Sequence, residues 1–356
     1  MSATERQHDP LDPAHTAAAD PSGQLADILG LPDHLRDALW KAESANLGSW
    51  DSPPGLVVAG MGGSGIGGRL ARAILADQAS RPILSAGTYG LPPWTTADAT
   101  VLCASYSGET EETLACFEAA GVIGARRVVA TTGGRLAEQA RAEGVPVIPL
   151  AGGLQPRAAV AYLTVAALEV AAACGAGPRL SPEIDVAGTH LEQLVAAWGP
   201  DSPADSEAKA LARALDGTVP IIMGAGLTAP IAYRWKTQIN ENAKQPAFSS
   251  ELPEADHNEL VGWTTAERFG RFSAVFLGDA DATPRIVERV ALTRELLAGR
   301  AASTHVIATR GQTSVERVFS LLLLGDIVSV YLAILAGQDP QDIGAIDELK
   351  SRLSRA

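Results

Sequence analysis

The sequence is poor in cysteine and in aromatic residues. Its three cysteines, Cys103, Cys116 and Cys174, are odd in number, widely spaced and form no Cys-x-x-Cys motif. This pattern argues against a disulfide framework and against a zinc site, and it fits a reducing compartment. Aromatic residues make up only 5% of the 356 positions, but 46% are hydrophobic, which is enough for a sizeable core. The length predicts two domains or one large one.

Basic residues are also in short supply. The chain has 28 Lys and Arg against 41 Asp and Glu, which gives a formal net charge of −13. A surface of this sign repels phosphate backbones, so we expect no nucleic-acid partner. An anionic ligand would have to be held by local geometry rather than by bulk charge.

A secretory signal pattern and a convincing membrane span are both missing. Residues 1–22 are polar and proline-rich, without a basic segment followed by an apolar one, so we interpret them as a disordered tail of a cytoplasmic protein. The most apolar stretch, Val318 to Gly337, has the length of a membrane span, but Asp326 lies near its middle. We therefore expect a buried core helix and no membrane partner.

Short apolar runs alternate with helical patterns from Gly55 onward. This alternation predicts an α/β protein with doubly wound parallel sheets, in which ligands bind beyond the carboxyl ends of the strands. We expect one domain over residues 23–180, a linker over residues 181–205 and a second domain over residues 206–356. The two halves echo each other, because Val57–Gly62 and Ile221–Gly226 are both apolar runs that end in Gly-x-Gly. We infer a duplicated domain.

The first glycine loop, Gly60 to Gly65, contains a Gly-x-Gly-x-x-Gly pattern after a predicted strand. A dinucleotide site would need an acidic residue at the end of the second strand, where Ser85-Ala-Gly stands instead. Gly63 and Ser64 suit a phosphate better, since backbone N–H groups and a hydroxyl can donate to it. A tight turn without a ligand is the alternative.

A second loop brings three hydroxyl groups to one predicted helix start. Ser105, Ser107 and Thr110 follow a buried strand and precede Glu111. One of them could simply cap the helix, but three around one helix N-terminus resemble an anion cradle that needs no Lys or Arg. The acids at the helix start fit compensation of the helix dipole.

Polar residues gather again after the second Gly-x-Gly. Glu241 lies in Asn240–Lys244, and His257 is flanked by acids in Asp256–Glu259. A carboxylate, a histidine and a phosphate cradle are suited to proton transfer. A metal is the competing interpretation, but the sequence has no His-x-x-x-His motif, so we expect none.

Proton transfer between carbons also needs a cation for the developing negative charge. Arg157, in Gln155-Pro-Arg, is the candidate, and its alternative is an exposed arginine at a helix start. From chemistry alone, Lys350 near the C-terminus is a weaker candidate, and a solvated lysine is its default interpretation.

These segments together resemble the bifunctional phosphoglucose/phosphomannose isomerase family of the phosphoglucose isomerase superfamily, whose members carry two sugar-isomerase (SIS) domains. The resemblance runs from about Leu25 to Lys350. It rests on six motifs in the same order: Gly62-Gly-Ser-Gly, Ser105-Tyr-Ser-Gly-Glu-Thr-Glu-Glu-Thr, Ala130-Thr-Thr-Gly-Gly, Gln155-Pro-Arg, Asn240-Glu-Asn-Ala-Lys and Glu251-Leu-Pro-Glu-Ala-Asp-His-Asn-Glu-Leu-Val-Gly-Trp.

The resemblance implies interconversion of glucose 6-phosphate, mannose 6-phosphate or both with fructose 6-phosphate, without metal or cofactor, through a cis-enediolate. It implies that Glu241 moves the proton between C1 and C2 and that Arg157 stabilises the enediolate. His257, reaching in from the partner subunit of a homodimer, and Lys350 would assist ring opening. The implied phosphate-binding residues are Gly63, Ser64, Ser105, Ser107 and Thr110.

The sequence departs from the family pattern in three places. Arg69 stands where an acid or a small residue is common, and Glu109 replaces an asparagine beside the expected cradle. Asp339 to Leu349 contains no threonine. A non-catalytic SIS-domain regulator is the alternative function, but the first 50 residues show no helix-turn-helix module. An aminotransferase half is a third possibility, although no glutaminase segment is present.

Overall fold

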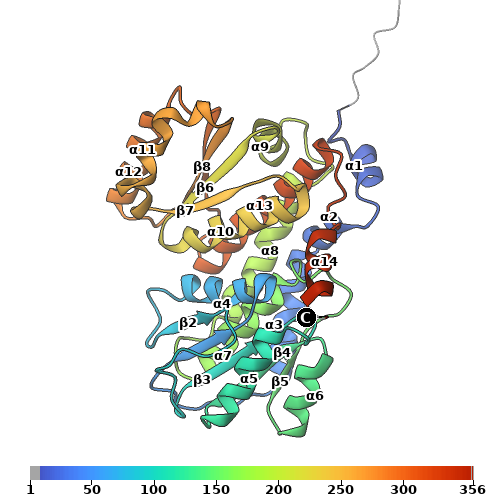
Figure 1. Cartoon of the computed structure of the whole chain (residues 1–356), viewed down its shortest axis with the longest axis vertical. Coiled ribbons are helices and arrows are strands. Elements are labelled where there is room, and N and C mark those ends of the chain that lie inside the picture. Colours follow the sequence, from blue (N-terminus) through green and yellow to red (C-terminus); the bar gives the residue numbers. More distant parts are fainter. Residues whose placement is uncertain (1–8, 354, 356) are drawn as a thin grey trace, which may run out of the picture.

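The computed structural model describes residues 9–353 and 355, and within them two parallel sheets lie toward opposite ends of the long axis (Figure 1). The first sheet has the order β2-β1-β3-β4-β5. Its strands are β1 (Leu56–Ala59), β2 (Ile83–Ala86), β3 (Thr100–Ala104), β4 (Arg126–Thr131) and β5 (Val147–Pro149). The second sheet has the order β7-β6-β8-β9. Its strands are β6 (Val219–Gly224), β7 (Phe248–Glu251), β8 (Phe272–Gly278) and β9 (Ser303–Ala308).

Helices cover both faces of the first sheet and separate it from the second (Figure 1). In the N-terminal half they are α1 (Pro13–Ala19), α2 (Gln24–Leu29), α3 (Leu31–Ser44), α4 (Gly62–Ile74), α5 (Glu111–Val122), α6 (Gly134–Ala142) and α7 (Val160–Ala173). In the C-terminal half they are α8 (Ser181–Trp198), α9 (Glu207–Leu215), α10 (Ala229–Gln238), α11 (Glu259–Gly262), α12 (Pro284–Leu297), α13 (Ser314–Leu335) and α14 (Gly344–Leu353). A π-helical turn, Ile239–Ala243, extends α10.

The predicted alternation of strands and helices is confirmed. The central strands β1 and β3 are buried along their whole length, as expected for parallel strands covered on both faces. The two sheets share the same order for their first four strands, and Gly62 and Gly226 open the two equivalent turns with φ of +51° and +53°. Fold and turn are therefore repeated, in agreement with the inferred duplication.

The most apolar segment is a core helix, as predicted. Helix α13 is long and apolar enough to cross a membrane, but 94% of its apolar window is buried inside the protein. It packs against α8, α9, α10 and the π-helical turn. Its Gly325 lies under the buried ring of Trp235, since an added Cβ would come within 2.1 Å of the indole nitrogen. Helix α13 thus joins the second sheet to the helices of the first.

The expected disordered tail differs from the structure over residues 9–22. Leu11 is fully buried, and α1 is capped by Asp12, whose carboxylate accepts from the His15 N–H. The Asp20 carboxylate accepts from the backbone N–H groups of the first turn of α2. These contacts anchor the segment, while residues 1–8 lie outside the described residues. In the segment expected to be a linker, residues 181–198 form α8, which packs against α3 and α13.

Candidate active site

The first glycine loop lies directly against the segment that carries Arg157. A Cβ on Gly63 would come within 2.9 Å of the Pro156 carbonyl oxygen and 3.2 Å of the Arg157 Cα. Only glycine leaves room for this approach, because contacts below 3.0 Å force the backbone to shift. The loop and Arg157 are therefore fixed relative to each other at the carboxyl end of β1.

A hydrogen bond joins the two predicted phosphate-binding loops. Ser64 Oγ accepts from the Tyr106 N–H at 3.1 Å, and both Ser64 and Ser105 are buried. The Ser64 hydroxyl still has its own proton to donate. Ser105 Oγ lies 2.9 Å from Thr110 Oγ1, at the start of α5. Three of the four predicted hydroxyls therefore gather where β1 and β3 end.

The fourth hydroxyl and the unusual glutamate occupy the outer part of the same loop. Ser107 is exposed, and its Oγ accepts from the Glu109 N–H at 3.2 Å. Glu109 accepts from the backbone N–H and the Nε of Arg135, both at 2.8 Å. This pairing with Arg135 holds the pKa of Glu109 below its ordinary value. The carboxylate that departs from the family pattern is thus engaged with the start of α6.

Arg157 and Glu241 meet, although they come from different halves of the chain. Arg157 is 4% exposed, so the alternative of an exposed arginine is wrong. Its Nη1 lies 3.7 Å from Glu241 Oε2, and the Glu241 side chain is 32% exposed. Burial lowers the pKa of Arg157, and Glu241 opposes that shift; a guanidinium stays charged in either case. A fixed cation therefore faces a carboxylate that solvent can still reach.

Two further partners orient the Arg157 guanidinium, and the residue patterns did not predict either of them. Its Nε donates to Asn242 Oδ1 at 2.7 Å, and its Nη2 donates to the Pro340 carbonyl at 2.8 Å. Pro340 is 183 positions away in the sequence, and nothing in its local pattern marks it. Asn242 lies within the motif quoted for the family, beside Glu241.

Among the residues that the structure describes, His257 and Lys350 form no hydrogen bond or ion pair with Arg157 or Glu241. His257 is exposed at the end of a 3-10 turn, and the neighbouring Asp256 bonds to Arg289 and Thr293 of α12. Figure 1 shows α11, which follows His257, at the outer side of the second sheet. Lys350 is exposed on α14.

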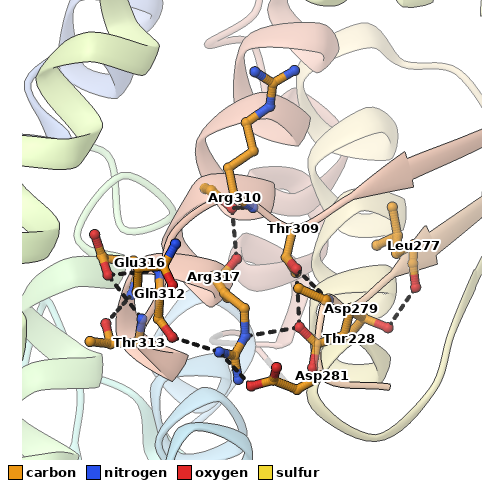
Figure 2. Close-up of polar contacts among 12 residues, drawn as sticks. Thr228, Leu277, Asp279, Asp281, Thr309, Arg310, Gln312, Thr313, Glu316 and Arg317 are labelled. Atoms are coloured by element: carbon orange, nitrogen blue, oxygen red, sulfur yellow. Dashed lines mark hydrogen bonds and ion pairs between the residues drawn. The ribbon is translucent and has the colours of Figure 1, made fainter. Parts of the chain in front are cut away.

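The corresponding edge of the second sheet carries different chemistry (Figure 2). Asp279 and Asp281 follow β8, where Ser105 and Ser107 follow β3. Arg317 forms ion pairs with both carboxylates, from Nε at 2.9 Å and from Nη1 at 2.8 Å.

At the second glycine turn, the hydroxyl that corresponds to Ser64 is already hydrogen-bonded within the protein. Thr228, two positions after Gly226 as Ser64 is after Gly62, donates to the Leu277 carbonyl at 2.8 Å. A cavity of about 1300 Å³ opens at this edge and is also lined by Arg69 of α4. The two acids and the satisfied hydroxyl of Thr228 distinguish this edge from the hydroxyl cradle of the first sheet.

Among residues 9–353 and 355 there is no group of three or more His, Cys, Asp and Glu side chains that could hold a metal ion. The contacts described above define the candidate site: the hydroxyl cradle of the first half, Arg157, and Glu241 from the second half.

Comparison with known proteins supplies the family. Residues 204–353 match the bacterial phospho-glucose isomerase C-terminal SIS domain. A bifunctional phosphoglucose/phosphomannose isomerase of Caldicellulosiruptor bescii is 36% identical over 332 residues, which cover 92% of this chain and 98% of the relative. A protein of the same name from Aquifex aeolicus is 33% identical over 302 residues, covering 85% and 91%.

Solved structures show the same fold. A glucose-6-phosphate isomerase like protein from Thermus thermophilus superposes with a TM-score of 0.63 at 21% identity, covering 97% of this chain and 99% of that one. A hypothetical protein from the same organism gives a TM-score of 0.68 at 16% identity, covering 94% and 91%. With curated relatives more than 30% identical over nearly its whole length, the chain belongs to the bifunctional phosphoglucose/phosphomannose isomerase family.

Proposed function

We propose that this protein is an aldose–ketose isomerase that interconverts glucose 6-phosphate, mannose 6-phosphate or both with fructose 6-phosphate. The observation that carries the proposal is the meeting of buried Arg157 with partly exposed Glu241, 3.7 Å apart, while the Arg157 backbone lies against the glycine loop of the hydroxyl cradle. One anion site, one carboxylate base and one fixed cation are what proton transfer between adjacent carbons of a sugar phosphate requires.

Each of these groups has a distinct part in the proposed reaction. Ser64, Ser105 and Thr110, with Ser107 and the Gly63 N–H at the rim, hold the phosphate. The Glu241 carboxylate removes the proton from C2 of the open-chain aldose, which leaves a cis-enediolate with its charge on oxygen. Arg157 stabilises that charge. A proton then passes from the C2 hydroxyl to the C1 oxygen, and Glu241 returns its own proton to C1. The product is the ketose, so the reaction consumes no other reagent.

Ring opening needs a further acid, and we assign it to His257 of the partner subunit in a homodimer, with Lys350 assisting. His257 is exposed and, among the described residues, forms no hydrogen bond or ion pair with the Glu241 of its own chain, which supports this assignment. In such a dimer the active sites lie at the subunit interface. We further propose a cytoplasmic protein that requires neither metal nor cofactor. The family consists of enzymes, which disfavours the regulator alternative.

Parallel coupled assays with glucose 6-phosphate and mannose 6-phosphate test the activity. Glu241→Gln should lose ~10²–10⁴-fold in kcat, the usual contribution of a general base. Glu118→Gln, an exposed carboxylate on α5, is the matched control and should leave kcat unchanged. Normal turnover by Glu241→Gln would remove its assigned role, and loss of activity in EDTA would overturn the metal-free proposal.

Mixing two inactive variants tests the dimeric site. A dimer of one Glu241→Gln chain and one His257→Ala chain contains one complete site if His257 acts across the interface. Random mixing in equal amounts should then restore about a quarter of the wild-type activity, because half of the dimers are mixed and each has one of two sites. An unrestored mixture of dimers would place His257 in its own chain's site, and an active His257→Ala chain would place it outside the mechanism.

A further inference from the structure

A buried ion pair joins the apolar helix α13 to α10 next to the main chain of Arg157. Arg234 of α10 donates from Nε and Nη2 to the two carboxylate oxygens of Asp326 in α13, at 3.1 and 2.5 Å. Their side chains are only 2% and 4% exposed. Desolvation makes such a pair a weak source of stability compared with apolar residues of similar size, so its presence calls for another explanation.

The ion pair holds the main chain of Arg157. Besides binding Asp326, Arg234 Nη2 donates to the Arg157 carbonyl oxygen at 2.9 Å. The Asp326 carboxylate fixes the plane of the Arg234 guanidinium, because two oxygens engage two of its nitrogens. Asp326, 92 positions from Arg234 in the sequence, thus sets where the backbone of Arg157 lies.

A second set of hydrogen bonds from α13 holds the side chain of Arg157. Ser329 Oγ donates to the Asp326 carbonyl at 2.7 Å and accepts from Asn242 Nδ2 at 2.8 Å. Asn242 then presents its oxygen to Arg157 Nε at 2.7 Å. Ser329 and Asn242 are fully buried, so water does not compete for these bonds.

The π-helical turn Ile239–Ala243 allows one segment to serve both the site and this support. It leaves Glu241 partly exposed and Asn242 fully buried, and π-helical turns occur often at functional sites. Lys244 ends the turn in the left-handed region, at φ +55°, and its Nζ donates to the Asn242 carbonyl at 3.1 Å. The base and the support of its cation are therefore consecutive residues.

We propose that Asp326, Arg234, Ser329 and Asn242 are positioning residues that hold Arg157 so that Nη1 faces Glu241. Nε is held by Asn242 and Nη2 by Pro340, so Nη1 is the guanidinium nitrogen directed toward the carboxylate. This proposal rests on the proposed function, in which Arg157 stabilises the enediolate. A misplacement of about 1 Å can cost ~10²-fold in rate, so rigid support is a catalytic requirement.

Two serines on α13 offer a matched pair of variants. Both are fully buried, donate to the carbonyl three positions earlier and accept one N–H: Ser329 from Asn242, and Ser320 from the Arg310 backbone. Ser329→Ala should lower kcat for fructose 6-phosphate by about tenfold, with KM within about twofold because the cradle is formed by other loops. Ser320→Ala should change neither constant. Equal kcat values for the two variants would overturn the proposal.

A double-mutant cycle separates positioning from general damage. Asn242→Ala should lower kcat by ~10–100-fold, but it should have almost no further effect in an Arg157→Ala chain, since the group it positions is gone. Multiplying effects would show that Asn242 acts independently of Arg157, and the proposal would fail. Wild-type kcat in Arg157→Ala alone would instead contradict the proposed function. Circular dichroism checks folding, and if Arg157→Ala does not fold, the serine pair decides.

Discussion

The approach of the first glycine loop to the Arg157 segment leads to a prediction whose size follows from the structure. The methyl group of Gly63→Ala would lie 2.9 Å from the Pro156 carbonyl oxygen, whereas a comfortable carbon–oxygen contact is about 3.4 Å. Loop and segment must therefore separate by about 0.5 Å. Since a misplacement of about 1 Å costs ~10²-fold, half of that predicts a loss of ~10-fold in kcat/KM for fructose 6-phosphate.

The control for this experiment is Gly152→Ala. Gly152 lies in the connection between β5 and α7 that also carries Pro156 and Arg157. Among the residues that the structure describes, and apart from Gly152 and its two chain neighbours, no heavy atom lies within 4 Å of a Cβ added there. Steady-state kinetics of both variants, with thermal melting to confirm folding, give the comparison. If Gly63→Ala keeps the kcat/KM of Gly152→Ala, the spacing between cradle and Arg157 does not govern catalysis and the reasoning is refuted.

Two stability predictions follow from the core and from a helix cap. Gly325→Ala should lower the free energy of unfolding by about 2 kcal/mol in urea titrations, because overpacking against Trp235 outweighs the helix propensity of alanine; an unchanged midpoint would contradict this. Burial favours protonation of Glu316, but N–H groups of Thr313 and Gln312 outweigh it and hold its pKa below 4.5. The charged form of Glu316 therefore stabilises the fold above that pH. Glu316→Gln should lower the free energy of unfolding by about 1 kcal/mol at pH 7 and by progressively less as pH falls below 4.5. A loss of stability independent of pH would exclude the carboxylate's role.

Features that depend on adjacent residues were predictable from the sequence. An apolar run followed by Gly-x-Gly predicts a strand that leads through a turn into a helix, and both segments have this structure, with Gly62 and Gly226 at positive φ in the turns. The hydroxyls of Ser105 and Thr110 follow a strand that ends at the same edge as β1, so their proximity to Ser64 follows from sheet topology. Each of these inferences needs only local pattern and the parallel order of strands.

Contacts between distant segments were not predictable in this way. In the sequence, Asp326 indicated only that the apolar run is not a membrane span. Its partner Arg234 is 92 positions away, so the ion pair could not be predicted. The burial of Arg157 depends on Pro340 and Asn242, on separate segments. Likewise, Leu11 is buried although the segment around it is polar. Local composition describes what a segment prefers, but these residues are placed by the surfaces that other segments present.

The two halves repeat a fold without repeating its chemistry, and charge explains why. The first edge offers N–H and hydroxyl donors, with which an acidic chain of net charge −13 can hold an anion without arginine or lysine. At the second edge, Asp279 and Asp281 stand in the positions of Ser105 and Ser107, and one guanidinium, Arg317, is bound by both. Both carboxylates engage Arg317, so this guanidinium is already paired, and the two acids repel a phosphate where the first edge offers donors. The turn geometry is common to both edges; the residues that follow the third strand of each sheet decide which edge is suited to a sugar phosphate.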